Sequence, residues 1–190
     1  MKYIARRFRL KGEGYCMLRS PEPADAALRI DFLRAVNAET DFMARGAEDS
    51  PADEDVVAEI LADQLEDPAA VEIAAFADDR MIACGGISPA ARAYPRKRHR
   101  AVFGICVRKE YWGQGIGRGI LEALMREAEG LGYSQVELTV VSDNLRARKL
   151  YETCGFVQTG IMPDALRRED GSFADEIFMV RKLHTKKAPE

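Results

Sequence analysis

The feature that most constrains the fold is a glycine-rich turn that joins an apolar run to an amphipathic one. The apolar run AVFGICV (101–107) predicts a buried strand, and EYWGQGIGRG (110–119), here called the glycine turn, follows it. Apolar side chains then recur at helical spacing, at Ile116, Ile120, Leu121, Leu124, Ala128 and Leu131. A further strand pattern, SQVELTVVS, comes after them. The sequence therefore predicts strand, helix, strand, with the helix beginning in the glycine turn.

Two helices are predicted upstream of that unit. The first begins at SPEPADAA, with Ser20 as the expected N-cap and Pro21 as the first helical residue. The second follows Ser50-Pro51 and ends near Asp67-Pro68. Its expected apolar stripe contains Val56, Val57, Ile60, Leu61 and Leu65.

Strand patterns occupy most of the remaining chain. Residues 3–11 and 15–19 predict two short strands around a GEG turn, and VEIAAFA and RMIACGGIS predict a hairpin across Asp78-Asp79. DNLRARKLYETCGF predicts a short helix that stops at Gly155, and FVQTGIM and SFADEIFMVRKL predict the last strands. The fold class is α+β (mixed α/β). We expect one domain over residues 1–190, with an N-terminal hairpin strand in 1–14 and a flexible tail at 184–190.

Composition excludes several classes of function. The formal net charge of −3 argues against nucleic-acid binding, and the basic patch RKRHR (96–100) is interpreted as a solvated loop. No apolar run approaches the roughly 20 residues that cross a bilayer, and the basic N-terminal segment lacks the apolar core of a secretory signal. The four cysteines form no CxxC pair, so we expect reduced thiols, no metal site and a cytoplasmic location.

The glycine turn admits several interpretations. A Walker A loop is excluded because no Gly-Lys-Ser/Thr sequence closes the turn. A dinucleotide fold would use Gly115-Ile116-Gly117 and Asp143, but Ile120 stands where the third glycine belongs and over 100 residues precede the motif. A pyrophosphate site built from main-chain N–H groups fits the turn. A tight turn without a ligand also remains open at this point.

Two segments together resemble the GCN5-related N-acetyltransferase (GNAT) family. They are ICVRKEYWGQGIGRGILEALMREA and, about 20 residues on, ELTVVSDNLRARKLYETCGF. The resemblance implies a central, mostly antiparallel sheet with a splayed parallel strand pair (101–108 and 134–141), flanked by four helices. It also implies that acetyl-CoA is bound between the splayed strands.

The resemblance assigns cofactor-binding residues in two possible registers. The family pattern is Q/R-x-x-G-x-G/A. In the first register, the letters of the pattern fall on Gln114, Gly117 and Gly119. In the second, the distance from the end of the strand selects Gly115 and Gly117 and places Trp112 at the Gln/Arg position. We prefer the second register, in which Trp112 departs from the family. The implied pyrophosphate ligands are main-chain groups of Gly113, Gln114, Gly115, Ile116, Gly117 and Arg118. Ile105, Cys106, Val107 and Asn144 would bind the pantetheine arm, although Asn144 could equally cap its helix.

The resemblance also implies the chemistry. An amine would attack the thioester directly, and Tyr151 would protonate the departing thiolate, unless it is only a packed core residue. The base is expected to be a carboxylate, with Glu39 preferred over Glu110 and Glu137. Thr139 stands where ribosomal-protein acetyltransferases of this fold look to have a glutamate, which counts against that substrate class.

Charge suggests an acceptor class. Residues 39–67 hold eleven acidic residues against one base, Arg45, which favours a cationic amine or is simply a solvated acidic face. The predicted function is acetyl transfer from acetyl-CoA to a primary amine of a small molecule such as a polyamine, an amino acid or an aminoglycoside. The alternatives are a peptide or protein acceptor and a non-catalytic acyl-CoA-binding domain. No nucleic-acid or membrane partner is expected, and the chain is a monomer or a homodimer.

Overall fold

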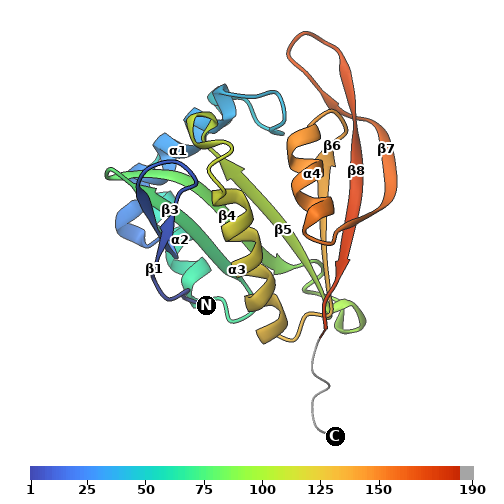
Figure 1. Ribbon diagram of the computed structural model, residues 1–190, viewed down its shortest axis with the longest axis horizontal. Helices are drawn as coiled ribbons and strands as arrows, with labels where there is room; N and C mark the ends of the chain where they lie inside the picture. The colour runs from blue at the N-terminus through green and yellow to red at the C-terminus, as the bar shows by residue number, and fades with distance from the viewer. Residues whose placement is uncertain (185–190) are drawn as a thin grey trace, which may run out of the picture. The chain divides into compact units, whose positions relative to one another are not determined.

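The computed structural model describes residues 1–184, which form eight strands and four α-helices (Figure 1). The chain begins with β1 (Arg6–Arg9) and β2 (Tyr15–Arg19), and continues through α1 (Ala26–Ala38), α2 (Glu54–Glu66), β3 (Val71–Ala77) and β4 (Arg80–Pro89). It then forms β5 (Arg100–Val107), α3 (Ile116–Gly130), β6 (Gln135–Val141), α4 (Leu145–Thr153), β7 (Val157–Arg167) and β8 (Phe173–Lys182). The element order predicted from the sequence is confirmed. Of the predicted tail, only His184 lies within the described residues.

The strands form one sheet in the order β1-β2-β3-β4-β5-β6-β8-β7. The pair β5 and β6 is parallel, and its ladder runs from Arg100↔Gln135 to Val102↔Glu137. Both strands continue beyond that ladder, β5 to Val107 and β6 to Val141. The predicted fold class, a mostly antiparallel sheet with one parallel pair and four helices, is confirmed. No helix within residues 1–184 has the length and hydropathy needed to cross a membrane.

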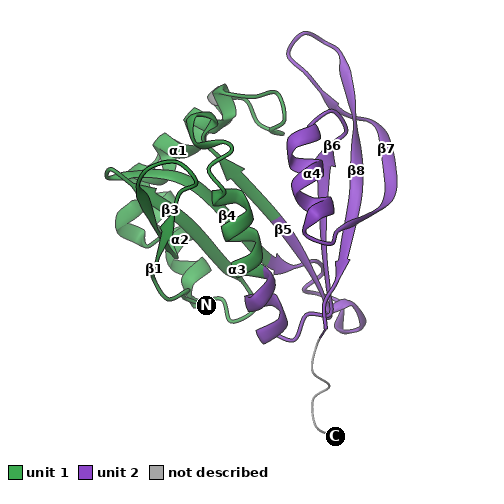
Figure 2. Ribbon diagram, viewed as in Figure 1, with its two compact units in different colours: residues 1–87, 104–124 green, residues 88–103, 125–190 purple. Residues whose placement is uncertain are grey.

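The chain divides into two compact units (Figure 2). Unit 1 contains residues 1–87 and 104–124, and unit 2 contains residues 88–103 and the described residues from 125 onward. The boundary passes through β5 and α3, so each of these elements contributes to both units. The single domain expected from the sequence stays a prediction.

The core of unit 1 lies between its helices and strands. Phe32 and Val36 of α1 pack on Ala74 of β3 and on Met81 and Cys84 of β4. A second cluster joins Ala26 and Ile30 of α1 to Val57 and Leu61 of α2. Burial of these apolar side chains is the main favourable contribution to folding of this unit.

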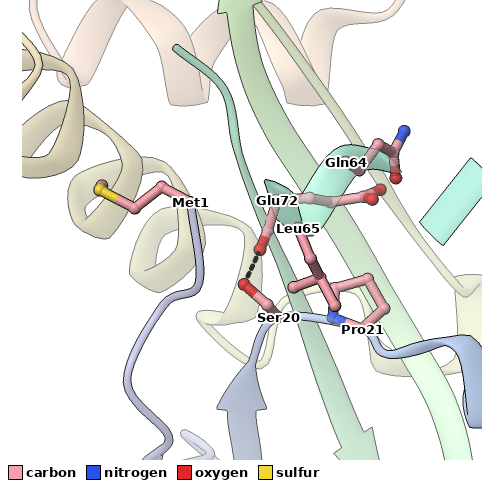
Figure 3. Close-up of a pocket in the computed structure, with 6 residues that line it drawn as sticks. All are labelled: Met1, Ser20, Pro21, Gln64, Leu65 and Glu72. Atoms are coloured by element: carbon pink, nitrogen blue, oxygen red, sulfur yellow. Dashed lines mark hydrogen bonds between the residues drawn. The ribbon is translucent and has the colours of Figure 1, made fainter. Parts of the chain in front are cut away.

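The start of the first helix differs from the prediction. Ser20 is not its N-cap: the Ser20 hydroxyl accepts a hydrogen bond from the Tyr3 N–H (2.9 Å) and donates one to the Glu72 carbonyl (2.8 Å; Figure 3). The first turn is a 3₁₀ turn over Pro23–Asp25, with Glu22 at the N-cap. The Glu22 N–H donates to the Asp25 carboxylate at 2.7 Å, and this bond closes the turn. The prediction failed because main-chain groups distant in sequence, the Tyr3 N–H and the Glu72 carbonyl of β3, bind the serine hydroxyl.

The apolar stripe predicted for α2 is only partly correct. Val57 and Leu61 are buried, but Val56 and Ile60 are 50% and 49% exposed. Only one face of α2 packs on α1. Val56 and Ile60 each lie about 100° around the helix from the buried residue that follows them, so they fall outside this contact. The N-cap is Asp53, whose carboxylate accepts from the Asp55 and Val56 N–H groups.

Two turns among the later strands are informative. The predicted Asp78-Asp79 hairpin turn is confirmed, with φ of 48° and 56°, as in a type I′ turn. β7 was expected to end at Met162, before Pro163, but it continues to Arg167. A bulge between Met162 and Leu166 absorbs the proline, and pairing resumes at Leu166↔Ala174.

Candidate functional site

The glycine turn has the backbone geometry of an anion-binding loop. Gly113 and Gly115 have φ of +81° and +87°, which side-chain-bearing residues rarely adopt, and α3 begins at Ile116. The first recorded α-helical bond runs from the Gly119 N–H to the Gly115 carbonyl (3.0 Å). The first N–H groups of α3 therefore lie at the positive end of the helix dipole.

The roles of the glycines favour the register with Gly115. Gly115 is required by its φ, whereas Gly119 is required by packing: a Cβ there would lie 2.4 Å from Cε2 of Phe8 in β1. Gly117 falls within the first turn of α3. The glycine at 119 therefore allows a strand to approach the helix, and the glycine at 115 shapes the loop that precedes the helix.

Trp112, which the sequence left without a role, fastens the turn to the strand before it. The Trp112 indole Nε1–H donates to the Val107 carbonyl at 2.8 Å, and the Trp112 N–H donates to the Lys109 carbonyl at 3.1 Å. The Trp112 side chain thus binds the last residue of β5. Part of the hydrogen-bonding capacity of Val107, a predicted pantetheine ligand, is used by this contact.

Gln114 is directed at the N-terminal hairpin. Its side-chain Oε1 accepts from the Gly12 N–H at 2.8 Å, and its carbonyl accepts from the Lys11 N–H at 3.0 Å. Its own N–H donates to the Tyr111 carbonyl at 3.4 Å. The Gln114 N–H, one of the predicted pyrophosphate ligands, is therefore already hydrogen-bonded within the turn.

The three candidate bases have different partners. Glu39 ends α1, and its Oε2 accepts from the Lys109 N–H (2.7 Å), directly after β5. Glu110 pairs with Arg80 at 3.2 Å, and Glu137 pairs with Arg100 at 2.6 Å. Glu39 is the one of the three whose recorded partner is a main-chain N–H rather than a cationic side chain.

Asn144 and Tyr151 belong to unit 2, whereas Glu39, residues 105–107 and residues 113–118 belong to unit 1. Asn144 caps α4: its Oδ1 accepts from the Ala147 N–H at 3.1 Å. The cap uses the amide oxygen, so donation from the amide nitrogen to a ligand stays a prediction. Tyr151 is buried, with its ring 6.0 Å from that of Phe103 and 5.9 Å from that of Phe156.

A largely buried polar cluster in unit 1 was missed by the sequence analysis. Arg29 of α1 pairs with Oε1 of Glu72 (2.7 Å), and the Cys84 thiol donates to the same oxygen (2.9 Å). Oε2 of Glu72 is buried and has no hydrogen-bond partner among residues 1–184. Burial raises the pKa of the Cys84 thiol well above its ordinary value, and burial also raises the pKa of Cys106. The available signals were Glu72 inside an apolar strand and Arg29 at helical spacing from Phe32 and Val36.

Three other features of residues 1–184 give no additional site. A shallow surface depression is lined by Met1, Ser20, Pro21, Gln64, Leu65 and Glu72 (Figure 3), and it encloses no volume that could hold even a water molecule. No group of three or more metal-ligating side chains was found within residues 1–184. The patch at 96–100 forms a 3₁₀ turn over Pro95–Lys97 and then enters β5 at Arg100.

The family model for the acetyltransferase (GNAT) family matches residues 33–156, more than half of the 190-residue chain. The chain belongs to the GNAT family. The matched segment contains Glu39, the glycine turn, Asn144 and Tyr151, so the family resemblance inferred from two motifs is confirmed.

Several characterised relatives are similar to parts of this GNAT chain. L-amino acid N-acetyltransferase AaaT of Escherichia coli is 32% identical over 88 residues, which are 46% of this chain and 54% of AaaT. The E. coli ribosomal protein bS18-alanine N-acetyltransferase is 37% identical over 78 residues, which are 41% of this chain and 52% of that enzyme. The chain thus spans about half the length of the curated relatives it matches.

Solved structures match more completely. A GNAT-family acetyltransferase from Streptococcus pneumoniae superposes with a TM-score of 0.83 and 28% identity, covering 88% of this chain and 99% of that one. The Salmonella typhimurium protein yncA, solved with its cofactor acetyl-CoA, has a TM-score of 0.78 and 20% identity, covering 92% of this chain and 98% of that one. At 20% identity the second match shows a common fold.

Proposed function

We propose that this GNAT protein is an N-acetyltransferase that moves the acetyl group of acetyl-CoA to a primary amine of a small molecule. The observation that carries the proposal is that one matched segment, 33–156, holds both the glycine turn and the Asn144–Tyr151 helix. The turn fits a pyrophosphate because Gly113 and Gly115 adopt positive φ and α3 begins directly after them. Main-chain N–H groups of Gly113 and of residues 115–118 would hold the pyrophosphate, since the Gln114 N–H is bonded within the turn. Main-chain groups of residues 105–107 and the Asn144 side chain would hold the pantetheine arm.

The proposed reaction is direct attack in a ternary complex. A free alkylamine has a pKa near ~10, so a proton must be removed before attack at neutral pH. Glu39 is the proposed base, acting through water, with Oε2 oriented by the Lys109 N–H (2.7 Å). Tyr151 is the proposed acid for the departing thiolate. These two side chains hold and move protons, and the thioester itself supplies the activated acetyl group.

Among small amines, an amino acid is the acceptor we propose first. The relatives AaaT and MnaT of E. coli are named for acyl transfer to L-amino acids. Thr139 argues against the ribosomal-protein class, in which a glutamate is expected at that position. The acidic residues between 39 and 67 also favour an acceptor that carries a positive charge.

An acceptor panel tests the proposal. The whole protein is incubated with acetyl-CoA and L-amino acids, spermidine, an aminoglycoside or a peptide beginning with alanine, and free thiol release is followed. We expect turnover with at least one amino acid. Turnover with the peptide alone would replace the small-molecule acceptor by a peptide or protein. No turnover with any amine, while CoA still raises the melting temperature, would assign a non-catalytic binding domain.

A change at Gly115 tests the turn directly. Gly115→Ala is expected to raise the Kd for CoA about tenfold, because a left-handed alanine is strained by about 1–2 kcal/mol and the loop must shift to relieve it. Its Cβ would also lie 3.4 Å from Cγ of Lys11. Calorimetric titration with CoA measures the effect. Gly132→Ala is the matched control, with φ of +82° and no heavy atom within 4 Å of its added Cβ. Equal Kd values for both variants would contradict a role for the turn.

A further inference from the structure

The N-terminal hairpin is docked on the glycine turn through main-chain and side-chain contacts. Two bonds to Gln114 hold its tip, one from the Lys11 N–H (3.0 Å) and one from the Gly12 N–H (2.8 Å). Phe8 of β1 packs against Gly119 in the first turn of α3. All of these residues belong to unit 1, so the hairpin tip and the turn form one local structure.

The Lys11 side chain lies over Gly115. From the position that a Cβ of Gly115 would take, Cγ, Cε and Cδ of Lys11 are 3.4, 3.5 and 3.7 Å away. Three consecutive carbons of the Lys11 stem therefore lie close to Gly115, and Nζ is one bond beyond the last of them. Lys11 is exposed and makes no ion pair within residues 1–184.

Arg118, the basic residue within the glycine turn, is less suitable. Arg118 forms an i,i+4 ion pair with Glu122 at 3.6 Å. Its guanidinium is therefore directed along α3, and its charge is partly neutralised by the carboxylate. The turn itself offers only N–H groups and roughly half a positive charge from the helix dipole. A pyrophosphate carries more negative charge than that, and a neighbouring ammonium group would balance it.

We propose that Lys11 binds the pyrophosphate of acetyl-CoA, so that the N-terminal hairpin completes the cofactor site that the glycine turn begins. The inference rests on the proposed function, since it assigns a further ligand to the same cofactor. Lys11 stands 102 positions before Gly113 in the sequence, and no motif links the two. Its contribution is a single charge at a solvent-exposed site, so the effect on affinity is moderate and sensitive to salt.

The test measures Kd for CoA and for dephospho-CoA, which keeps the pyrophosphate but lacks the 3′-phosphate. Lys11→Gln is expected to weaken both ligands about 5- to 10-fold at low salt, the size of one exposed charge-assisted contact, and Lys11→Arg to stay within about twofold of the wild type. Arg9→Gln is the matched control: it removes one charge from the same hairpin, on the face of β1 opposite Phe8.

Each other outcome has a distinct meaning. Equal Kd values for Lys11→Gln and Arg9→Gln would overturn the role of Lys11 while leaving the proposed function intact. Weakening of CoA alone would also overturn it, because the 3′-phosphate would then be the group that Lys11 binds. If the wild-type protein binds neither ligand, the proposed function fails, and the role of Lys11 with it.

Discussion

Replacing Arg29 with methionine is expected to lower the free energy of unfolding by about 3–5 kcal/mol, the usual effect of removing one partner of a buried ion pair. Arg29 and Glu72 are 17% and 15% exposed, and Oε2 of Glu72 already lacks a partner among residues 1–184. Without the guanidinium, the carboxylate keeps only the Cys84 thiol at 2.9 Å. Urea denaturation monitored by circular dichroism measures the change.

Two further variants make this prediction specific. Arg34→Met makes the same substitution at an exposed position of α1 and is expected to change stability by no more than about 0.5 kcal/mol. The double variant Arg29→Met with Glu72→Met removes both charges and is expected to recover much of the loss. A loss below about 1 kcal/mol for Arg29→Met alone would contradict the prediction that this pair is energetically important.

Replacing Tyr151 with phenylalanine is expected to lower kcat by about two orders of magnitude, the lower end of what general acid catalysis contributes. The ring contacts with Phe103 and Phe156, at centroid distances of 6.0 and 5.9 Å, do not involve the hydroxyl. Phenylalanine therefore preserves the aromatic packing, and KM for acetyl-CoA is expected to stay near its wild-type value. Thiol release with the best acceptor from the panel, measured between pH 6 and 9, gives the comparison.

Tyr133→Phe controls for loss of a buried hydroxyl. Tyr133 is 4% exposed and lies between α3 and β6, so this variant reports the effect of removing such a group elsewhere in unit 2. A kcat for Tyr151→Phe equal to that of the wild type at every pH would leave Tyr151 as a packing residue only.

The sequence predicted best what depends on local periodicity and turn chemistry. The stripe from Ile116 to Ala128 is buried, and the hairpin across Asp78-Asp79 forms as expected. The glycine turn was also located correctly, because a left-handed glycine between a strand and a helix leaves a recognisable pattern. These features are determined within about fifteen residues of chain.

What the sequence did not predict depends on residues distant in the chain. Ser20 bonds to Tyr3 and Glu72 instead of capping a helix. Arg29 and Glu72 meet across 43 positions, and no local rule selects that pair. The assignment of catalytic and cofactor-binding residues came from the family resemblance, and it stays a prediction until the variants are measured.

Trp112 gives the protein a built-in spectroscopic probe. It is the single tryptophan of the chain, so fluorescence excited selectively at tryptophan arises at one position. That position is the glycine turn, where the indole N–H is bonded to the Val107 carbonyl at 2.8 Å. Emission intensity and wavelength therefore report on the hydration and rigidity of this loop alone, and ligand titrations need no attached dye.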